Sequence, residues 1–170
     1  YNPVAIDLRF VLAMMKMNSD LERIGDFAEG IARFIIKDEG EGAPDPELVK
    51  KLRLEDMIEQ VLSMLDTARQ ALLHEDLGLA NSLFTKDNIV DEINGHVSKI
   101  LADYVHQNPE KAQFCFDFKS VFLKLERAGD HVTNLAEEIV FYIDAEVLKH
   151  SYDDSKANEA LAHKMNEGEN

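Results

Sequence analysis

Apolar residues recur at three- and four-residue spacing along most of the chain, and this period constrains the fold more than any other feature. Such a stripe is typical of an amphipathic α-helix, whereas a half-buried strand would alternate at every second residue. The four prolines lie between these stretches, as expected for a residue that fits a first helical turn and breaks a helix interior. Eight glycines in 170 residues leave little turn chemistry for many short strands. The sequence therefore predicts an all-α fold.

The same pattern divides the chain into four long helices. We expect them at about residues 3–37, 47–74, 76–106 and 109–150. Residues 38–46 combine Gly, Pro and acidic residues without periodicity, which predicts a linker between a first segment, 1–37, and a second, 47–150. Short breaks favour antiparallel neighbours, so 47–150 is expected to form a self-sufficient three-helix bundle.

The two ends of the chain differ in their apolar faces. The first helix has a broad apolar face but no bundle of its own, so we expect it to pack on the bundle of 47–150 or on a second copy of the chain. Residues 151–170 begin without an apolar face and are expected to form a polar tail, whose only expected structure is a frayed or weakly docked polar helix.

The net charge and the cysteine content limit the binding partners and the cellular location that suit this protein. The chain has 18 Lys and Arg against 33 Asp and Glu, and its formal net charge of −15 disfavours binding to nucleic acid or to an anionic membrane. The longest apolar run, Phe10 to Met15, has six residues, too few for direct membrane insertion, which needs about 20. The single cysteine, Cys115, excludes an internal disulfide and suits a cytoplasmic protein. Its two Phe neighbours predict a small core residue.

One motif occurs twice. Leu21–Asp26 recurs 104 residues later as Leu125–Asp130, and both copies lie on predicted long helices. In each copy a Glu and an Asp stand four residues apart and project from one face, where they repel each other. A cation that bridges the two carboxylates is the simplest use for such a pair. The pairs are Glu22 with Asp26 and Glu126 with Asp130.

A glycine precedes the Asp in each copy of the motif. Gly25 and Gly129 each cost about 1 kcal/mol relative to Ala inside a helix. The close approach of a neighbouring helix or of a bound ion would explain them. Arg23 and Arg127 are alternative partners for the acids, which would then be ordinary residues of a solvated helix face.

A third acidic pair, Asp87 and Asp91, lies near the middle of the helix at 76–106. An antiparallel bundle can place this pair opposite Glu126 and Asp130. Four carboxylates on two facing helices would form an oxygen-rich site suited to Mg, Mn or Fe, with zinc less favoured without His or Cys ligands. His131, beside Asp130, fits either a helix-surface residue or a neighbour of the metal.

These motifs, together with the run Asn2–Arg9, resemble the PhoU family of phosphate-uptake regulators over about residues 1–150. The resemblance implies two three-helix bundles, with residues 1–37 holding the last helix of a first bundle whose first two helices would precede Asn2. It also implies polynuclear metal sites, iron in particular, on the motif carboxylates. One site would use Glu22 and Asp26, and the other would use Asp87, Asp91, Glu126 and Asp130.

The resemblance further implies a cytoplasmic protein, not an enzyme, that inhibits phosphate transport and phosphate-starvation signalling. Its partners would be a transporter component or a sensor kinase, and the chain would form a homo-oligomer. The cofactors would be divalent or trivalent metal ions, either a polynuclear iron cluster or Mg, Mn or Zn.

Three alternatives remain open. PhoU-like domains also occur fused to sodium/phosphate cotransporters, so the chain could be such a domain. A carboxylate-bridged di-iron enzyme needs Glu-x-x-His on two helices, and none of the six histidines has Glu three residues before it. A purely structural helical protein would use the acids for solubility alone.

Overall fold

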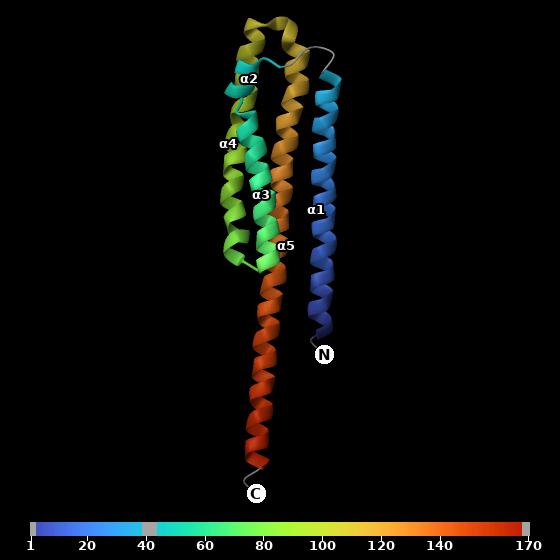
Figure 1. The fold of residues 1–170 in the computed structure, drawn as a ribbon, viewed down its shortest axis with the longest axis vertical. Helices are drawn as coiled ribbons and strands as arrows, with labels where there is room; N and C mark the ends of the chain where they lie inside the picture. Colours follow the sequence, from blue (N-terminus) through green and yellow to red (C-terminus); the bar gives the residue numbers. More distant parts are fainter. Residues whose placement is uncertain (1–2, 39–43, 168–170) are drawn as a thin grey trace.

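The computed structural model describes residues 3–38 and 44–167, with side chains placed at 7–36 and 44–144 (Figure 1). These residues contain helices and no strand, which confirms the predicted all-α class. The elements in chain order are α1 (Pro3–Asp38), α2 (Pro46–Lys51), α3 (Leu54–His74), α4 (Leu77–Gln107), the 3-10 helix η1 (Pro109–Lys111) and α5 (Ala112–Glu167).

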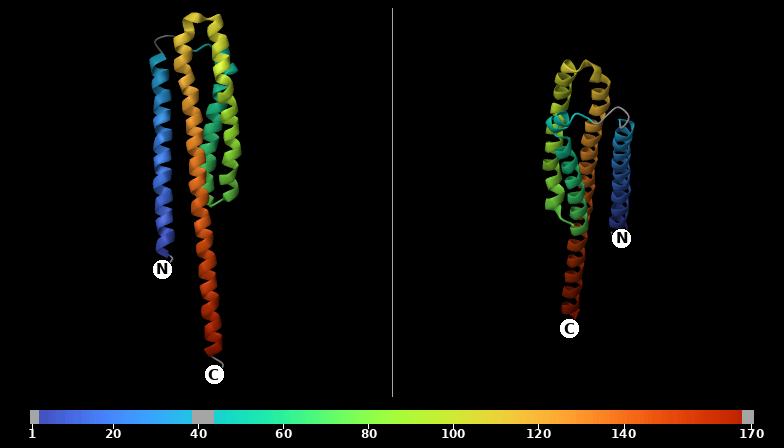
Figure 2. Two further views of the ribbon diagram at one scale, coloured as in Figure 1. Left: turned by 180° about the vertical axis from the view of Figure 1, so that it is seen from behind. Right: turned by 45° about the horizontal axis from the view of Figure 1, so that its top comes forward.

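Helix α5 is the centre of the arrangement. Helices α3 and α4 pack against each other and against α5, whereas α1 packs along α5 from the other side (Figures 1 and 2). The first helix therefore packs on the bundle, as expected, and it does so through its contact with α5. The long helices α1, α3, α4 and α5 alternate in direction along the chain (Figure 1), and the short connections from α3 to α4 and from α4 to α5 favour this.

Two predicted helix boundaries are wrong. The helix expected at 47–74 is divided between α2 and α3, because Arg53 adopts a left-handed backbone with φ of 56°. Leu48 and Leu52 remain buried across this break, so the apolar period continues although the helix does not. The last helix, expected to end near residue 150, continues without a break to Glu167 through the segment in which at most a polar helix is expected. Ala, Glu and Lys favour a helix even in a segment that has no apolar face. The spacing of apolar residues does not reveal such a helix.

Side chains and prolines define the other helix starts. Oδ1 of Asp76 accepts a hydrogen bond of 3.0 Å from the backbone N–H of Leu79 and caps α4. Pro109 occupies the first position of η1, directly after Asn108, as the sequence predicts.

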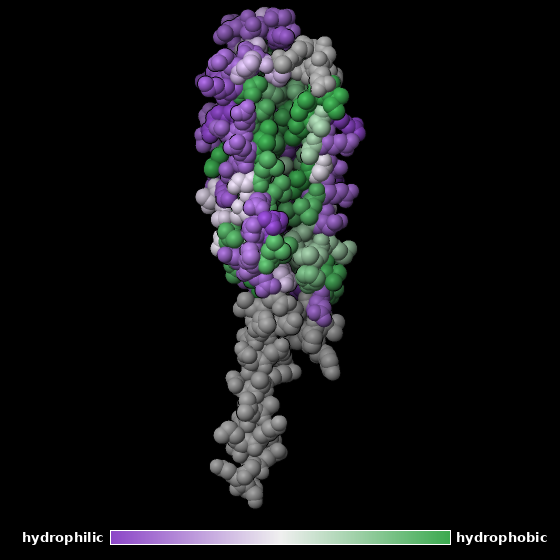
Figure 3. Space-filling model, in the orientation of Figure 1, coloured by the Kyte–Doolittle hydropathy of each residue, from purple (hydrophilic) through white to green (hydrophobic). Residues whose placement is uncertain are grey.

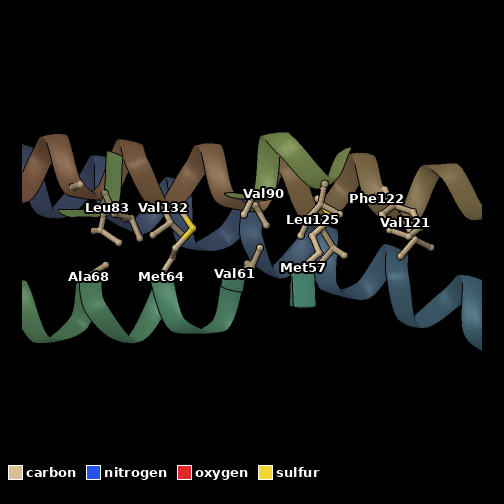
Figure 4. Close-up of a cluster of buried hydrophobic side chains, with 14 of the residues drawn as sticks. Met57, Val61, Met64, Ala68, Leu83, Val90, Val121, Phe122, Leu125 and Val132 are labelled. Atoms are coloured by element: carbon tan, nitrogen blue, oxygen red, sulfur yellow. The ribbon is translucent and has the colours of Figure 1, made fainter. Parts of the chain in front are cut away.

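The core of the bundle is a continuous set of apolar side chains between α3, α4 and α5 (Figure 4). Phe118 and Phe122 of α5 are almost completely buried, and their ring centroids lie 5.4 Å apart in an edge-to-face arrangement. Cys115 is also buried, which confirms its predicted place in the core.

Helix α1 joins this core through aromatic and polar contacts with α5. Phe34 stacks on Phe118 with ring centroids 5.7 Å apart. Oδ1 of Asp20 accepts a hydrogen bond of 3.3 Å from Nδ2 of Asn134. Because the two helices are antiparallel, each step forward on α1 is a step back on α5 (Figure 1). At this register the first motif copy lies beside the second, with Gly25 level with Gly129.

An apolar groove lies between α1 and α3, with α5 as its floor (Figure 3). Met14 and Leu21 of α1 face Leu65 and Leu72 of α3 across it. The side chains of α1 on its other faces include exposed apolar residues, among them Met15, which is 65% exposed. Helix α1 thus buries only part of its apolar stripe against α5.

We predict that Phe122→Ala destabilises the protein by about 3–5 kcal/mol, because the truncation leaves a cavity in the centre of the bundle. The free energy of unfolding from urea titration measures this loss. Phe84→Ala is the control, since Phe84 is 41% exposed, and it should cost about 1 kcal/mol or less. Equal losses in the two variants would contradict the assignment of Phe122 to the core.

Candidate metal centre

The carboxylate of Asp87 lies between α4 and the backbone of α5. Gly129 makes this possible, because a Cβ at that position would lie 2.8 Å from Oδ1 of Asp87 and 3.5 Å from Cγ1 of Val90. No real Cβ approaches another heavy atom as closely as 2.8 Å. The expectation that a neighbouring helix closely approaches the motif glycine is therefore confirmed at Gly129.

Asp87 is the most electrostatically strained acid of the region. Its Oδ1 atom is buried and accepts no hydrogen bond from any described residue. Burial, followed by the nearby charges of Asp91, Asp130 and Glu126, raises the pKa of Asp87 to about 6. A buried carboxylate oxygen without a donor is costly, and a cation is one way to satisfy it.

The acids of α5 share this environment. Burial and then the charges of Asp130 and Asp91 raise the pKa of Glu126, and Arg127 opposes the shift. Burial, followed by the smaller effect of the charge of Asp91, raises the pKa of Asp130. The charges of His131 and Arg127 partly offset this rise. Burial is the largest cause of each shift, and the rest reflects carboxylates close enough to repel one another. The structure thus brings together the four acids that the sequence places on two facing helices.

These four acids do not yet form a closed cage. Among the described residues, no three His, Cys, Asp or Glu side chains converge as a ready metal-binding group. Asp91 and Asp130 are exposed, whereas Asp87 lies against Gly129. The donor set consists of oxygens, which suits hard cations. With a buried oxygen that lacks a donor and a cradle that a Cβ would fill, the residues fit a metal ion.

The first motif copy has different surroundings. Glu22 and Asp26 are exposed on α1, and Nη1 of Arg23 lies 3.8 Å from Oδ2 of Asp26. A Cβ at Gly25 would meet no described atom within 4 Å beyond its own helix. The close approach expected at this glycine is therefore not met within the described residues. Glu22 and Asp26 are not among the charges that shift the pKa values of Asp87, Glu126 and Asp130.

The sequence missed a polar link between α1 and α5. Nδ1 of His131 and Oδ1 of Asp20 lie 2.6 Å apart, and both side chains are mostly buried. His131 is thus held by α1 rather than directed at the acids beside it. No local signal predicts this pair. Asp20 lies directly before the first copy of the repeat, and Lys124 stands at the corresponding position before the second copy.

Comparison with known proteins decides the family. The sequence profile described as the PhoU domain matches residues 1–35 and 54–139. The chain belongs to the PhoU family. It is 31% identical over 141 residues to the phosphate-specific transport system accessory protein PhoU homolog 1 of Thermotoga maritima, covering 83% of this chain and 60% of the relative. It is 34% identical over 147 residues to the PhoU homolog of Caulobacter vibrioides, covering 86% and 62%.

The crystal structure of PhoU from Pseudomonas aeruginosa has the same fold. It matches with a TM-score of 0.76 and 30% identity, over 85% of this chain and 68% of that one. The chain spans about 60% of the length of the Thermotoga relative, so the comparison covers part of a PhoU protein. Among the described residues, no helix is long and apolar enough to cross a membrane.

The two motif glycines give a matched prediction for this PhoU chain. Gly25→Ala should stabilise the protein by about 1 kcal/mol, because Ala favours helix and the site is open. Gly129→Ala should not give this stabilisation, because the Cβ of the alanine would displace the carboxylate of Asp87. Thermal and urea unfolding of both variants measure the difference. Equal stabilisation by the two substitutions would contradict the close approach of Asp87 to α5.

The raised pKa of Asp87 predicts how stability depends on pH. The folded state binds a proton at Asp87 more tightly than the unfolded state does. The ionised carboxylate therefore destabilises the folded protein fully above pH 6, and this destabilisation decreases as the pH falls toward about 4. In the presence of a chelator, Asp87→Asn should be more stable than the wild type at pH 7.5, by about 1 kcal/mol after allowance for partial exposure. This advantage should shrink at pH 4. Glu137→Gln, an exposed acid on α5, is the control and should show no such trend.

Proposed function

We propose that this chain is an accessory regulator of phosphate uptake that binds metal on α4 and α5 and acts through contacts with other proteins. The observation that carries the metal part is the buried oxygen of Asp87, which has no hydrogen-bond donor and lies among other carboxylates. The named relatives support the regulatory part, since they are accessory proteins of phosphate-specific transport systems.

Asp87, Asp91, Glu126 and Asp130 would hold the metal. A bound cation would neutralise the repulsion between these acids and join α4 to α5. Asp87 would be the anchor because it is already oriented by Gly129, and the exposed acids would close around the ion. Iron, manganese and magnesium suit this donor set best, and zinc is less favoured.

Glu22 and Asp26 form the weaker candidate pair. Two carboxylates leave most of the coordination of a cation to water. Arg23 also competes for Asp26. We expect these acids to contribute little metal affinity to the chain as described.

The partners we propose are a phosphate transporter component or a sensor kinase, with a second copy of the chain forming a homo-oligomer. The role is regulatory rather than catalytic, so no reaction is assigned to the carboxylates. The proposed location is the cytoplasm, where the single cysteine would remain reduced.

Removal of one acidic pair should abolish metal binding. Glu126→Gln with Asp130→Asn keeps side-chain size and deletes two charges, so the fold should survive while the affinity for metal falls by at least about tenfold. Metal content after reconstitution with Fe, Mn, Mg and Zn and extensive dialysis measures this. Glu137→Gln with Asp144→Asn deletes the same charge from exposed positions of the same helix and is the matched control. Glu138 is left intact because it pairs with Lys16 at 2.8 Å.

Two results would reject the metal part of the proposal. One is equal metal content in the acidic-pair variant and the wild type, and the other is no metal in either after reconstitution. The regulatory part is tested separately in a bacterium that lacks its own PhoU and carries a phosphate-responsive reporter. Expression of the chain within a complete PhoU protein should repress the reporter, and failure to do so would reject this part.

A further inference from the structure

A second groove lies near the end of the α4–α5 hairpin, away from the acidic cluster. Leu101, Ala102 and Val105 of α4 line it together with Ala112, Cys115 and Phe116 of α5, and the cavity measures about 480 Å³. We call it the tip groove. The view from behind in Figure 2 shows the hairpin end at which these two helices meet.

Phe116 gives the tip groove an unusual surface. It is 76% exposed, more than any other large apolar side chain in the described part of the chain. An exposed Phe beside an apolar depression is typical of a contact surface, because aromatic anchors dominate the binding energy of protein interfaces. Single exposed apolar residues are common, so the groove beside this residue is what distinguishes it.

The residues that line the tip groove differ in charge from the chain as a whole. None of the residues that line it is Asp or Glu, although the chain has 33 such residues and a formal net charge of −15. Lys119 and His106 stand at the groove, and Lys119 is its one permanent charge. A complementary partner is therefore acidic at its edges and apolar at its centre.

The shape of the groove favours a helix as the partner. It runs between two antiparallel helices, and small side chains at Ser98, Ala102 and Ala112 allow another backbone to come close. Helix-in-groove recognition uses this arrangement, with apolar anchors at helical spacing in the groove. We propose that the tip groove binds an acidic amphipathic helix of a partner protein, with apolar residues against Phe116 and carboxylates near Lys119.

Other occupants fit the charges less well. An anionic membrane would face much of the surface of the chain and is repelled by its net charge, whereas a single helix meets the groove alone. A second copy that contacts the groove with its own groove would bring Lys119 and no acid, so the two surfaces would not complement each other. The proposal does not depend on the metal centre, since none of the four acids lines the groove. It therefore goes beyond the regulatory function by naming the surface and the chemistry of the partner.

The test uses a synthetic 21-residue amphipathic helix with Leu and one Trp on its apolar face and Glu on its polar face. The chain has no Trp, so the emission of the peptide reports burial directly. A matched peptide with Lys in place of every Glu is the charge control. At 0.15 M salt we expect the Glu peptide to bind more tightly than the Lys peptide, although the net charge of the chain alone would favour the Lys peptide.

Variants of the chain locate the binding. Phe116→Ser and Lys119→Glu should each weaken binding of the Glu peptide by at least about tenfold. Phe84→Ser on α4 and Lys51→Glu on α2 change the same residue types outside the groove and should leave binding unchanged. The variant Glu126→Gln with Asp130→Asn should also bind the peptide normally, which separates this inference from the metal proposal.

Several outcomes would overturn the inference. They are no binding of the Glu peptide, binding that survives both groove substitutions, and tighter binding of the Lys peptide. Sedimentation that shows a dimer lost in Phe116→Ser would also overturn it, by assigning the groove to contact between copies of the chain.

Discussion

Burial of α5 between α1, α3 and α4 is the constraint on which the rest of the structure depends. Phe118 illustrates it, because this residue meets Phe122 toward the bundle core and Phe34 toward α1. Apolar surface removed from water contributes about 25 cal/mol per Å², so a helix covered on several sides contributes more than its neighbours. The acids of its motif, Glu126 and Asp130, lie at the edge where α5 meets α4.

At that edge the sequence departs from what stability alone would favour. Gly129 weakens the helix, Glu126 and Asp130 repel each other, and Asp87 holds a buried oxygen without a donor. Each feature costs free energy by itself, yet all of them lie within one small region. Local conflicts of this kind are expected at functional sites rather than in the packing core. Their concentration at one point is the physical basis of the metal site proposed above.

The duplicated motif has the same residues but different surroundings in its two copies. Gly129 faces Asp87 of α4, whereas Gly25 faces open space within the described residues. The antiparallel contact of α1 and α5 places the two glycines at the same level, so the difference lies in the helices that cover them. The pKa values of Asp87, Glu126 and Asp130 are raised because the packing of α4 on α5 excludes water and brings further charges close. The packing around the second motif copy, and not the motif alone, thus produces this environment.

The sequence by itself determined the helical class, the bounds of α1, the core position of Cys115 and the family, because these follow from local periodicity, capping and motif spacing. It also indicated that an antiparallel bundle can place Asp87 and Asp91 opposite the second motif. Only the tertiary structure decided that Oδ1 of Asp87 is buried without a donor. The same holds for the break at Arg53 and the link between Asp20 and His131. Desolvation and contacts between distant segments depend on what packs against a residue, and no pattern along the chain records this.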